Sequence, residues 1–321
     1  MIFAVWIPLL VPLLAVPAAR GLAESLPPRA AAWLLTGCAA ALAGCTAAAL
    51  GLLLAAGVLR LPPVAALGHL SPPLLGDRGD GAATVPVAVA AAVLLGAGTL
   101  AVACHARRHR AELRTARHAT GAHPATGDLV VLPDPAPEAY ALPGRPGRVV
   151  VTAGMLRSLT ADEREALFAH ERAHLAGRHH LFLLTVALSA ACHPLLRALR
   201  APLAYALERW ADEAAASRVG DRRVTARAIG RAALAARPDA RAPRRPGGVL
   251  AATAGPVPRR VAALLADERA TGHPRVRAGF RGRRLIAAAL LACVAFSAAA
   301  ALDAAADLHE SVEVAQGEAP R

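Results

Sequence analysis

Long runs of apolar residues dominate the pattern along this chain of 321 residues. A membrane-spanning helix needs about 20 mainly apolar residues, because the hydrocarbon core of a bilayer is roughly 30 Å thick. Four segments meet this requirement, namely Ile2–Ala19, Ala31–Val58, Ala82–Cys104 and Leu285–Leu302. The pattern therefore predicts a mainly α-helical, integral membrane protein with about four transmembrane helices.

The first of these segments is interrupted by Pro8, Pro12 and Pro17. Membrane helices tolerate proline better than soluble helices do. A cleaved signal peptide is the alternative, but the segment lacks a basic beginning and further spans follow it, so we favour a retained helix. A fifth apolar run, Leu181–Cys192, is too short to cross comfortably, which favours a core helix or one that lies along the bilayer surface.

The placement of arginines predicts the orientation of the spans. Basic residues crowd both ends of the segment between the third and fourth spans, at 107–117 and 275–284. By the positive-inside rule, that segment faces the cytoplasm. The expected organisation is a three-span membrane region at 1–104, a cytoplasmic domain at 105–284, a fourth span at 285–302 and a short acidic tail outside at 303–321.

The cytoplasmic segment contains an H-E-x-x-H pattern made by His170, Glu171 and His174. Thr160 and Glu163 form a capping box ahead of it, which predicts that the pattern lies on a helix. Positions i and i+4 share one face of a helix, so the two imidazoles can point at one metal ion with Glu171 beside them. This arrangement is typical of zinc hydrolases.

A catalytic zinc ion needs a third protein ligand and an open position for water. A stretch without glycine or proline, Ala204–Ala216, predicts a second helix on which Glu208 and Asp212 share a face. Glu208 would complete a His-His-Glu site, and Asp212 could accept the free ring N–H of a ligand histidine. The alternative is that both are solvated helix charges, the usual fate of such residues. The upstream pattern favours the ligand interpretation.

Shorter elements surround these helices. Asp128–Leu132 and Val149–Thr152 predict two strands that could form a small antiparallel edge, where an extended substrate could add as another strand. Helices are expected at Val224–Ala236 and Val261–Asp267, on either side of a loop at Ala242–Pro258 that is rich in proline and glycine.

The order of these motifs resembles that of gluzincin membrane metallopeptidases, and most closely the BlaR/MecR type of β-lactam-sensing signal transducers. The motifs are the strand-like 148–154, Leu159-Thr160 leading into the H-E-x-x-H, His193-Pro194-Leu195-Leu196 and Glu208-x-x-x-Asp212, within about residues 128–232. The resemblance implies a peptidase with one zinc ion, with His170, His174 and Glu208 as ligands and Glu171 as general base. Relatives often have an acidic residue shortly after the second histidine, whereas Arg178-His179-His180 follows here.

The chemistry of such a site follows from the charge of the metal ion. Zinc lowers the pKa of a bound water and polarises the scissile carbonyl, while Glu171 takes the water's proton and passes it to the leaving amine. The expected reaction is peptide hydrolysis without a covalent intermediate. Tyr205, His193 and His273 are candidates for stabilising the oxyanion, and the sequence does not choose among them.

A net charge of +13 raises the question of nucleic acid. The basic residues lie at membrane edges and on expected helix faces without interleaved aromatic residues, so no nucleic-acid binding is expected. The lipid bilayer, with its anionic headgroups, is the simpler partner. A protein or peptide is the expected substrate, and the oligomeric state is unknown from the sequence.

Three roles remain open from the sequence. The first is regulatory proteolysis, either of a repressor such as a winged-helix protein or of the enzyme's own loop, Ala242–Pro258. The second is quality control or processing, as in the HtpX and CAAX-protease group, and the third is an inactive membrane adaptor. The motif at 193–195 and the layout of spans favour the first role, and Glu171 argues against the third. Direct acylation by a β-lactam is not expected, because the 19 residues after Leu302 contain no Ser-x-x-Lys motif.

Overall fold

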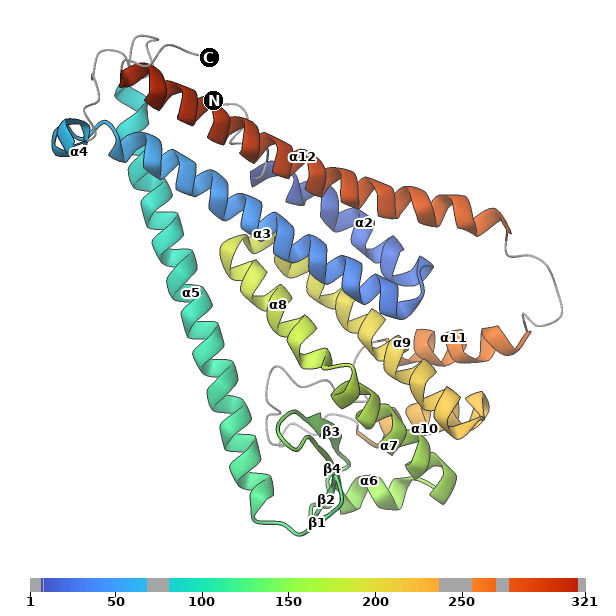
Figure 1. Ribbon diagram of the computed structural model, residues 1–321. Helices are drawn as coiled ribbons and strands as arrows, with labels where there is room; N and C mark the ends of the chain where they lie inside the picture. The colour runs from blue at the N-terminus through green and yellow to red at the C-terminus, as the bar shows by residue number, and fades with distance from the viewer. Residues whose placement is uncertain (1–6, 8, 68–80, 237–255, 270–276, 317–321) are drawn as a thin grey trace.

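The computed structural model describes the chain except for residues 1–6, 8, 68–80, 237–255, 270–276 and 317–321. The described part is mostly helical, with one small sheet (Figure 1). Its helices are α2 (Pro12–Ser25), α3 (Pro28–Val58), α4 (Pro62–Leu67), α5 (Gly81–Gly121), α6 (Ala153–Ser158), α7 (Ala161–Ala176), α8 (His179–Cys192), the 3-10 helix η1 (Pro194–Leu199), α9 (Arg200–Val219), α10 (Arg222–Ala235), α11 (Val257–Arg269) and α12 (Arg277–Ala315). The strands are β1 (Ala125–Thr126), β2 (Leu129–Leu132), β3 (Ala139–Leu142) and β4 (Arg148–Thr152).

Three of the described helices are long and apolar enough to cross a membrane. The candidate spans are Pro28–Val58 in α3, Thr84–Gly121 in α5 and Ala287–Ala315 in α12, which overlap the second, third and fourth predicted spans. α7 and α8 would add another only if this pair, bent by 53°, were one span. Only 11% of the most apolar 18-residue stretch of α5 is buried inside the protein, as suits a surface that contacts lipid.

The first predicted span, Ile2–Ala19, is not among these helices. Its described part enters α2, a helix of 14 residues that begins at Pro12 after a turn at Val11. α2 packs against α3, α9 and α12. Because residues 1–6 and 8 lie outside the described residues, this span stays a prediction.

Two spans continue as helix beyond the predicted limits. α5 runs on through the arginine-rich stretch to Gly121, and α12 runs on through the acidic stretch to Ala315. Both extensions are built mainly from residues that tolerate a helix, such as alanine, arginine, leucine and glutamate, and neither contains proline. The predicted boundaries at residues 104 and 302 therefore fall inside continuous helices.

The sheet has the strand order β1-β2-β4-β3. The predicted antiparallel pairing of the second and fourth strands is wrong, because β2 and β4 are parallel, with Val130 opposite Val150. The physical reason is that the connection between them contains a strand of its own, β3, which pairs antiparallel with the other side of β4. The chain thus re-enters the sheet in its original direction.

Two apolar cores hold the site in place. In the first, α8, η1 and α9 pack with α2 and α3 and bury Leu35, Val186 and Leu203. In the second, α7 packs on the sheet and α6 through Val151 and Met155. α8 is therefore a core helix beside the spans, one of the two predicted alternatives, and α7 leads from it to the sheet (Figure 1).

Candidate metal centre

A capping box fixes the start of α7, the helix that carries the H-E-x-x-H pattern. The N–H of Thr160 donates to Glu163 Oε2 at 3.0 Å, as the sequence predicts. The same oxygen accepts a hydrogen bond from Arg231 Nη1 of α10 at 3.1 Å. The cap therefore satisfies free N–H groups at the start of α7 and also links α7 to α10. Both contacts make the helix a rigid support for ligands.

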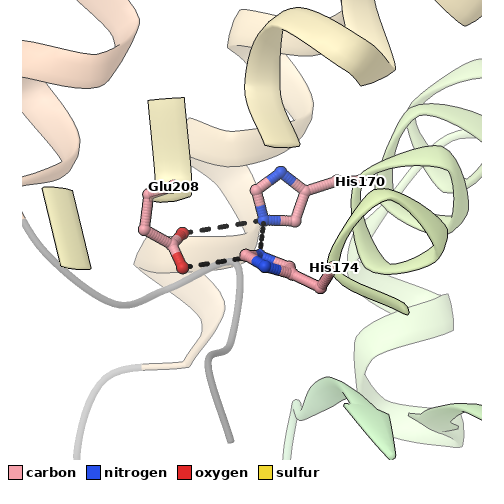
Figure 2. Close-up of side chains that lie close together, drawn as sticks. All are labelled: His170, His174 and Glu208. Carbon is pink, nitrogen blue, oxygen red and sulfur yellow. Dashed lines mark hydrogen bonds and ion pairs between the residues drawn. The ribbon is translucent and has the colours of Figure 1, made fainter. Parts of the chain in front are cut away.

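The two histidines of α7 meet Glu208 of α9 (Figure 2). The Nε2 atoms of His170 and His174 are 3.0 Å apart. Glu208 Oε2 lies 3.6 Å from His170 Nε2, and Oε1 lies 3.5 Å from His174 Nε2. All three side chains are buried, with at most 4% of any of them exposed. The structure thus brings together the three residues that the sequence singled out as ligands.

The separations among these donor atoms fit a tetrahedral zinc ion. Ligands that bind zinc at 2.0–2.1 Å in a tetrahedron lie about 3.3 Å from one another. The observed distances of 3.0, 3.5 and 3.6 Å bracket this value. Three protein ligands leave the fourth position for water or substrate, as in catalytic zinc sites.

The buried charges around the group also favour a cation. Glu171, Glu208 and Asp212 are at most 1% exposed, and they face the buried guanidinium of Arg260. Three buried carboxyl groups thus stand against one buried guanidinium, and this excess of acidic groups favours a bound cation. Burial alone would lower the pKa of His170, but Asp212 and Glu208 outweigh burial and raise this pKa to about 9.

Asp212 holds His170 from the side opposite to the candidate metal position. Its Oδ1 lies 3.0 Å from His170 Nδ1, so that Nε2 is the nitrogen turned toward Glu208. Arg260 donates two hydrogen bonds to the same carboxylate, from Nε to Oδ2 at 2.8 Å and from Nη2 to Oδ1 at 2.6 Å. Burial would raise the pKa of Asp212, but Arg260 and His170 together lower it. Asp212 therefore stays ionised beside His170.

Arg260 is a residue of this site that the sequence did not indicate. It lies on α11, is fully buried, and places Nη1 2.7 Å from Glu208 Oε2. Its neighbour Arg259 has a side chain that is 52% exposed and pairs with Glu24. Two adjacent arginines look alike in sequence, and the contact with Asp212 joins residues 48 positions apart. Because Arg260 lies three residues after Val257 and four before Leu264, helix periodicity places it on the apolar face of α11, but it does not specify which distant carboxylate the arginine contacts.

His174 has a different partner at its second ring nitrogen. Its Nδ1 lies 2.6 Å from Nδ1 of His179, which is 1% exposed. Burial, followed by the charges of nearby groups such as His170, lowers the pKa of His174 well below its usual range, so this ring is neutral. His179, in the Arg178-His179-His180 segment that follows the second histidine, therefore contacts a candidate ligand.

The candidates for stabilising an oxyanion have other contacts. Tyr205 lies 5.1 Å from the guanidinium carbon of Arg259, measured from the ring centre. His193 Nε2 lies 3.0 Å from the carbonyl oxygen of Leu9. His273 lies outside the described residues. The two described candidates are thus engaged in packing and hydrogen bonding with Arg259 and Leu9.

Comparison with known proteins identifies the family of this chain. No curated protein and no solved structure matches this chain. Residues 104–276 match the sequence profile of peptidase family M48. The matched range contains all three residues of the buried group and supports a metallopeptidase function. Because the match covers more than half of its length, the chain belongs to peptidase family M48.

Proposed function

We propose that this protein is a zinc-dependent membrane endopeptidase that hydrolyses peptide bonds on the cytoplasmic side of the membrane. The observation that carries the proposal is the buried group of His170, His174 and Glu208, with donor spacings that suit a tetrahedral ion. Membership of a peptidase family supports the same chemistry.

Each residue of the group has a role that suits its place. His170 and His174 present Nε2, and Glu208 presents a carboxylate oxygen. When bound, zinc would lower the pKa of a water molecule and polarise the peptide carbonyl. Glu171, fully buried next to His170 in the sequence, accepts the proton of the water and delivers it to the leaving amine. Asp212 keeps His170 oriented.

The metal content of purified protein tests this proposal. We expect about one zinc ion per chain, the number that one three-ligand site holds. Glu171→Gln should keep the zinc but reduce peptide hydrolysis by about 10²–10⁴-fold, because it removes only the general base. His170→Ala combined with His174→Ala should lose both zinc and hydrolysis.

Glu165→Gln is the matched control, because Glu165 is an exposed carboxylate on the same helix. It should change neither zinc content nor hydrolysis. Equal zinc in wild type and in the double histidine variant, measured by mass spectrometry of the metal, would contradict the assignment.

The cytoplasmic placement of the site rests on the arginines at both ends of the 105–284 segment. In the fold, the C-terminal end of α12 lies at the opposite end of the bundle from the sheet (Figure 1). A reporter inserted near Gly121 should therefore report the cytoplasm, and one fused after Arg321 should report the outside. Two fusions on the same side would overturn the proposed topology.

Regulatory proteolysis of the BlaR/MecR type is the biological role that we propose. The metal group is buried, so only a backbone that can extend into the site is expected to be cut. A cytoplasmic repressor, or the enzyme's own Ala242–Pro258 segment, would meet this requirement. Most of that segment, residues 242–255, lies outside the described residues. Membranes with wild type should show one or a few cleavages that Glu171→Ala abolishes, with a narrow change in transcripts.

A quality-control or processing role is the second candidate, and one observation favours it. α7 leads directly into α8, which packs against the spans α3 and α5, so α7, the helix that carries both histidines, lies at one end of the membrane bundle (Figure 1). Substrates already in the bilayer would reach it there. Accumulation of many misfolded membrane proteins in the Glu171→Ala strain, without one stabilised repressor, would decide for this role. An unchanged strain would point to an adaptor.

A further inference from the structure

The break between α7 and α8 turns the chain back toward the second candidate ligand. Gly177 ends α7, and Arg178 adopts the left-handed conformation with φ 51° and ψ 41°, which L residues rarely occupy. α8 then begins at His179. A Cβ at position 177 would overlap the Nε2 and Cδ2 atoms of the His179 ring. The strained turn and the glycine together make room for this ring beside α7.

The His179 ring meets His174 at the nitrogen that faces away from Glu208. The two Nδ1 atoms are 2.6 Å apart, and both side chains are buried. At this distance the two nitrogens are joined by a hydrogen bond, in which one donates its proton and the other accepts it. A metal-binding histidine usually donates its second N–H to a carboxylate, a backbone carbonyl or water. Here the partner is another imidazole.

The direction of this hydrogen bond follows from the role of His174. A neutral imidazole has one N–H and one acceptor nitrogen. To offer an unprotonated Nε2 to a metal ion, His174 must carry its proton on Nδ1 and donate it to His179. His179 must then carry its own proton on Nε2.

The surroundings of His179 keep its ring in one orientation. Among the described residues, its buried Nε2 has no hydrogen-bond partner, so the ring's hydrogen bond is the one at Nδ1. The ring lies against Trp210, with ring centres 4.6 Å apart, and meets Phe182 at 89° with centres 6.3 Å apart. An imidazole packed in this way has little freedom to turn away from His174. The carboxyl group of Asp212, by contrast, is held on the other histidine by Arg260.

We infer that His179 is a positioning residue of the metal centre, and that its Nδ1 accepts the Nδ1–H of His174 and fixes the ring so that Nε2 faces the metal. The inference rests on the proposed zinc site. It gives His179 the part for His174 that Asp212 has for His170.

Two substitutions of His179 test the inference, because they differ in whether the atom at the position of Nδ1 can accept a hydrogen bond. In His179→Phe, a carbon replaces Nδ1 and the aromatic packing is kept, so zinc affinity should fall by about 10–100-fold. In His179→Asn, the side-chain oxygen is as many bonds from Cα as Nδ1 is and can accept the same hydrogen bond, so most of the affinity should return. Affinity is measured by competition with a chelator, and the visible spectrum of the cobalt-loaded protein reports the ligand geometry.

His180→Phe is the matched control, because His180 is the next residue of α8 and is only partly buried. It should leave zinc affinity and the cobalt spectrum unchanged. The metal-free melting temperature of each variant separates a loss of zinc from a loss of fold. Wild-type affinity in a folded His179→Phe protein, or equal weakness of folded His179→Phe and His179→Asn, would overturn the inference.

A measurement on the unmodified protein covers the case in which His179→Phe does not fold. In the zinc-loaded protein, nitrogen NMR of the histidine rings should show His174 protonated at Nδ1 and metal-bound at Nε2, with His179 protonated at Nε2. Metal bound at Nδ1 of His174 would overturn the inference. Wild type that binds no zinc would instead contradict the proposed function, so the two failures are distinguishable.

Discussion

The two histidines of α7 face one candidate metal position but are supported by different chemistry. Behind His170 lies a charged pair, Asp212 and Arg260, which come from α9 and α11. Behind His174 lies the neutral ring of His179, which packs against Trp210. Both supports contact the ring nitrogen away from the metal position, so both can orient a ligand.

The difference shows what a charged support adds to orientation. Asp212 and Glu208 raise the pKa of His170 to about 9, whereas burial and the surrounding charges lower the pKa of His174. The charged side therefore makes its ligand a stronger base, but it depends on a buried ion pair that is costly to break. The neutral ring of His179 orients His174 without depending on a buried ion pair. Three predictions test this contrast.

Breaking the charged side at Arg260 should have the largest effect. Arg260→Met leaves Asp212 and Glu208 without their guanidinium partner in a buried place, so the free energy of unfolding should fall by about 3–5 kcal/mol. The control Arg259→Met removes the exposed pair with Glu24 and should cost at most about 1 kcal/mol. Denaturant unfolding of both metal-free variants in detergent gives the comparison. Equal stability of the two would show that the Arg260 pair is not structurally important.

Removing only the charge of Asp212 should have a smaller effect, and it should fall on metal binding. Asp212→Asn keeps the shape of the side chain but lowers the basicity of His170, so zinc affinity should fall by about 10–100-fold. Glu213→Gln is the control, because the next carboxylate is partly exposed and pairs with Arg222 at 2.7 Å. Competition with a chelator measures both. An affinity as high as that of the control would mean that Asp212 does not support the ligand.

The smallest predicted effect is a shift in the pH at which zinc affinity levels off. Because the pKa of His170 is about 9, the ring is protonated at neutral pH and zinc must displace one proton. Affinity should therefore rise by about tenfold per pH unit between pH 6 and 8 and level off above about pH 9. In Asp212→Asn the pKa of His170 should be lower, so the levelling should begin at a lower pH. The same pH dependence in both proteins would contradict the role of Asp212.

Much of the site could be predicted because its parts are local. The capping box at Thr160 and Glu163, the i, i+4 spacing of His170 and His174, and the helix that carries Glu208 and Asp212 are each contained within a few turns of one helix. The apolar segments of α3, α5 and α12 are equally local, because their length against the bilayer thickness suffices to recognise them. The sequence by itself therefore determined the helices and the residues that face one way on each.

Tertiary structure decided the contacts between distant parts of the chain. It brought Arg260 to Asp212, 48 positions away in the sequence, and it paired β2 with β4 in parallel because β3 occupies the far side of β4. It also folded His179 onto His174 through a left-handed residue that no helix or strand pattern predicts. The reason is physical, because helix and strand periodicity specifies which side chains share a face, whereas the partner of that face is selected by packing and buried charge across the whole fold.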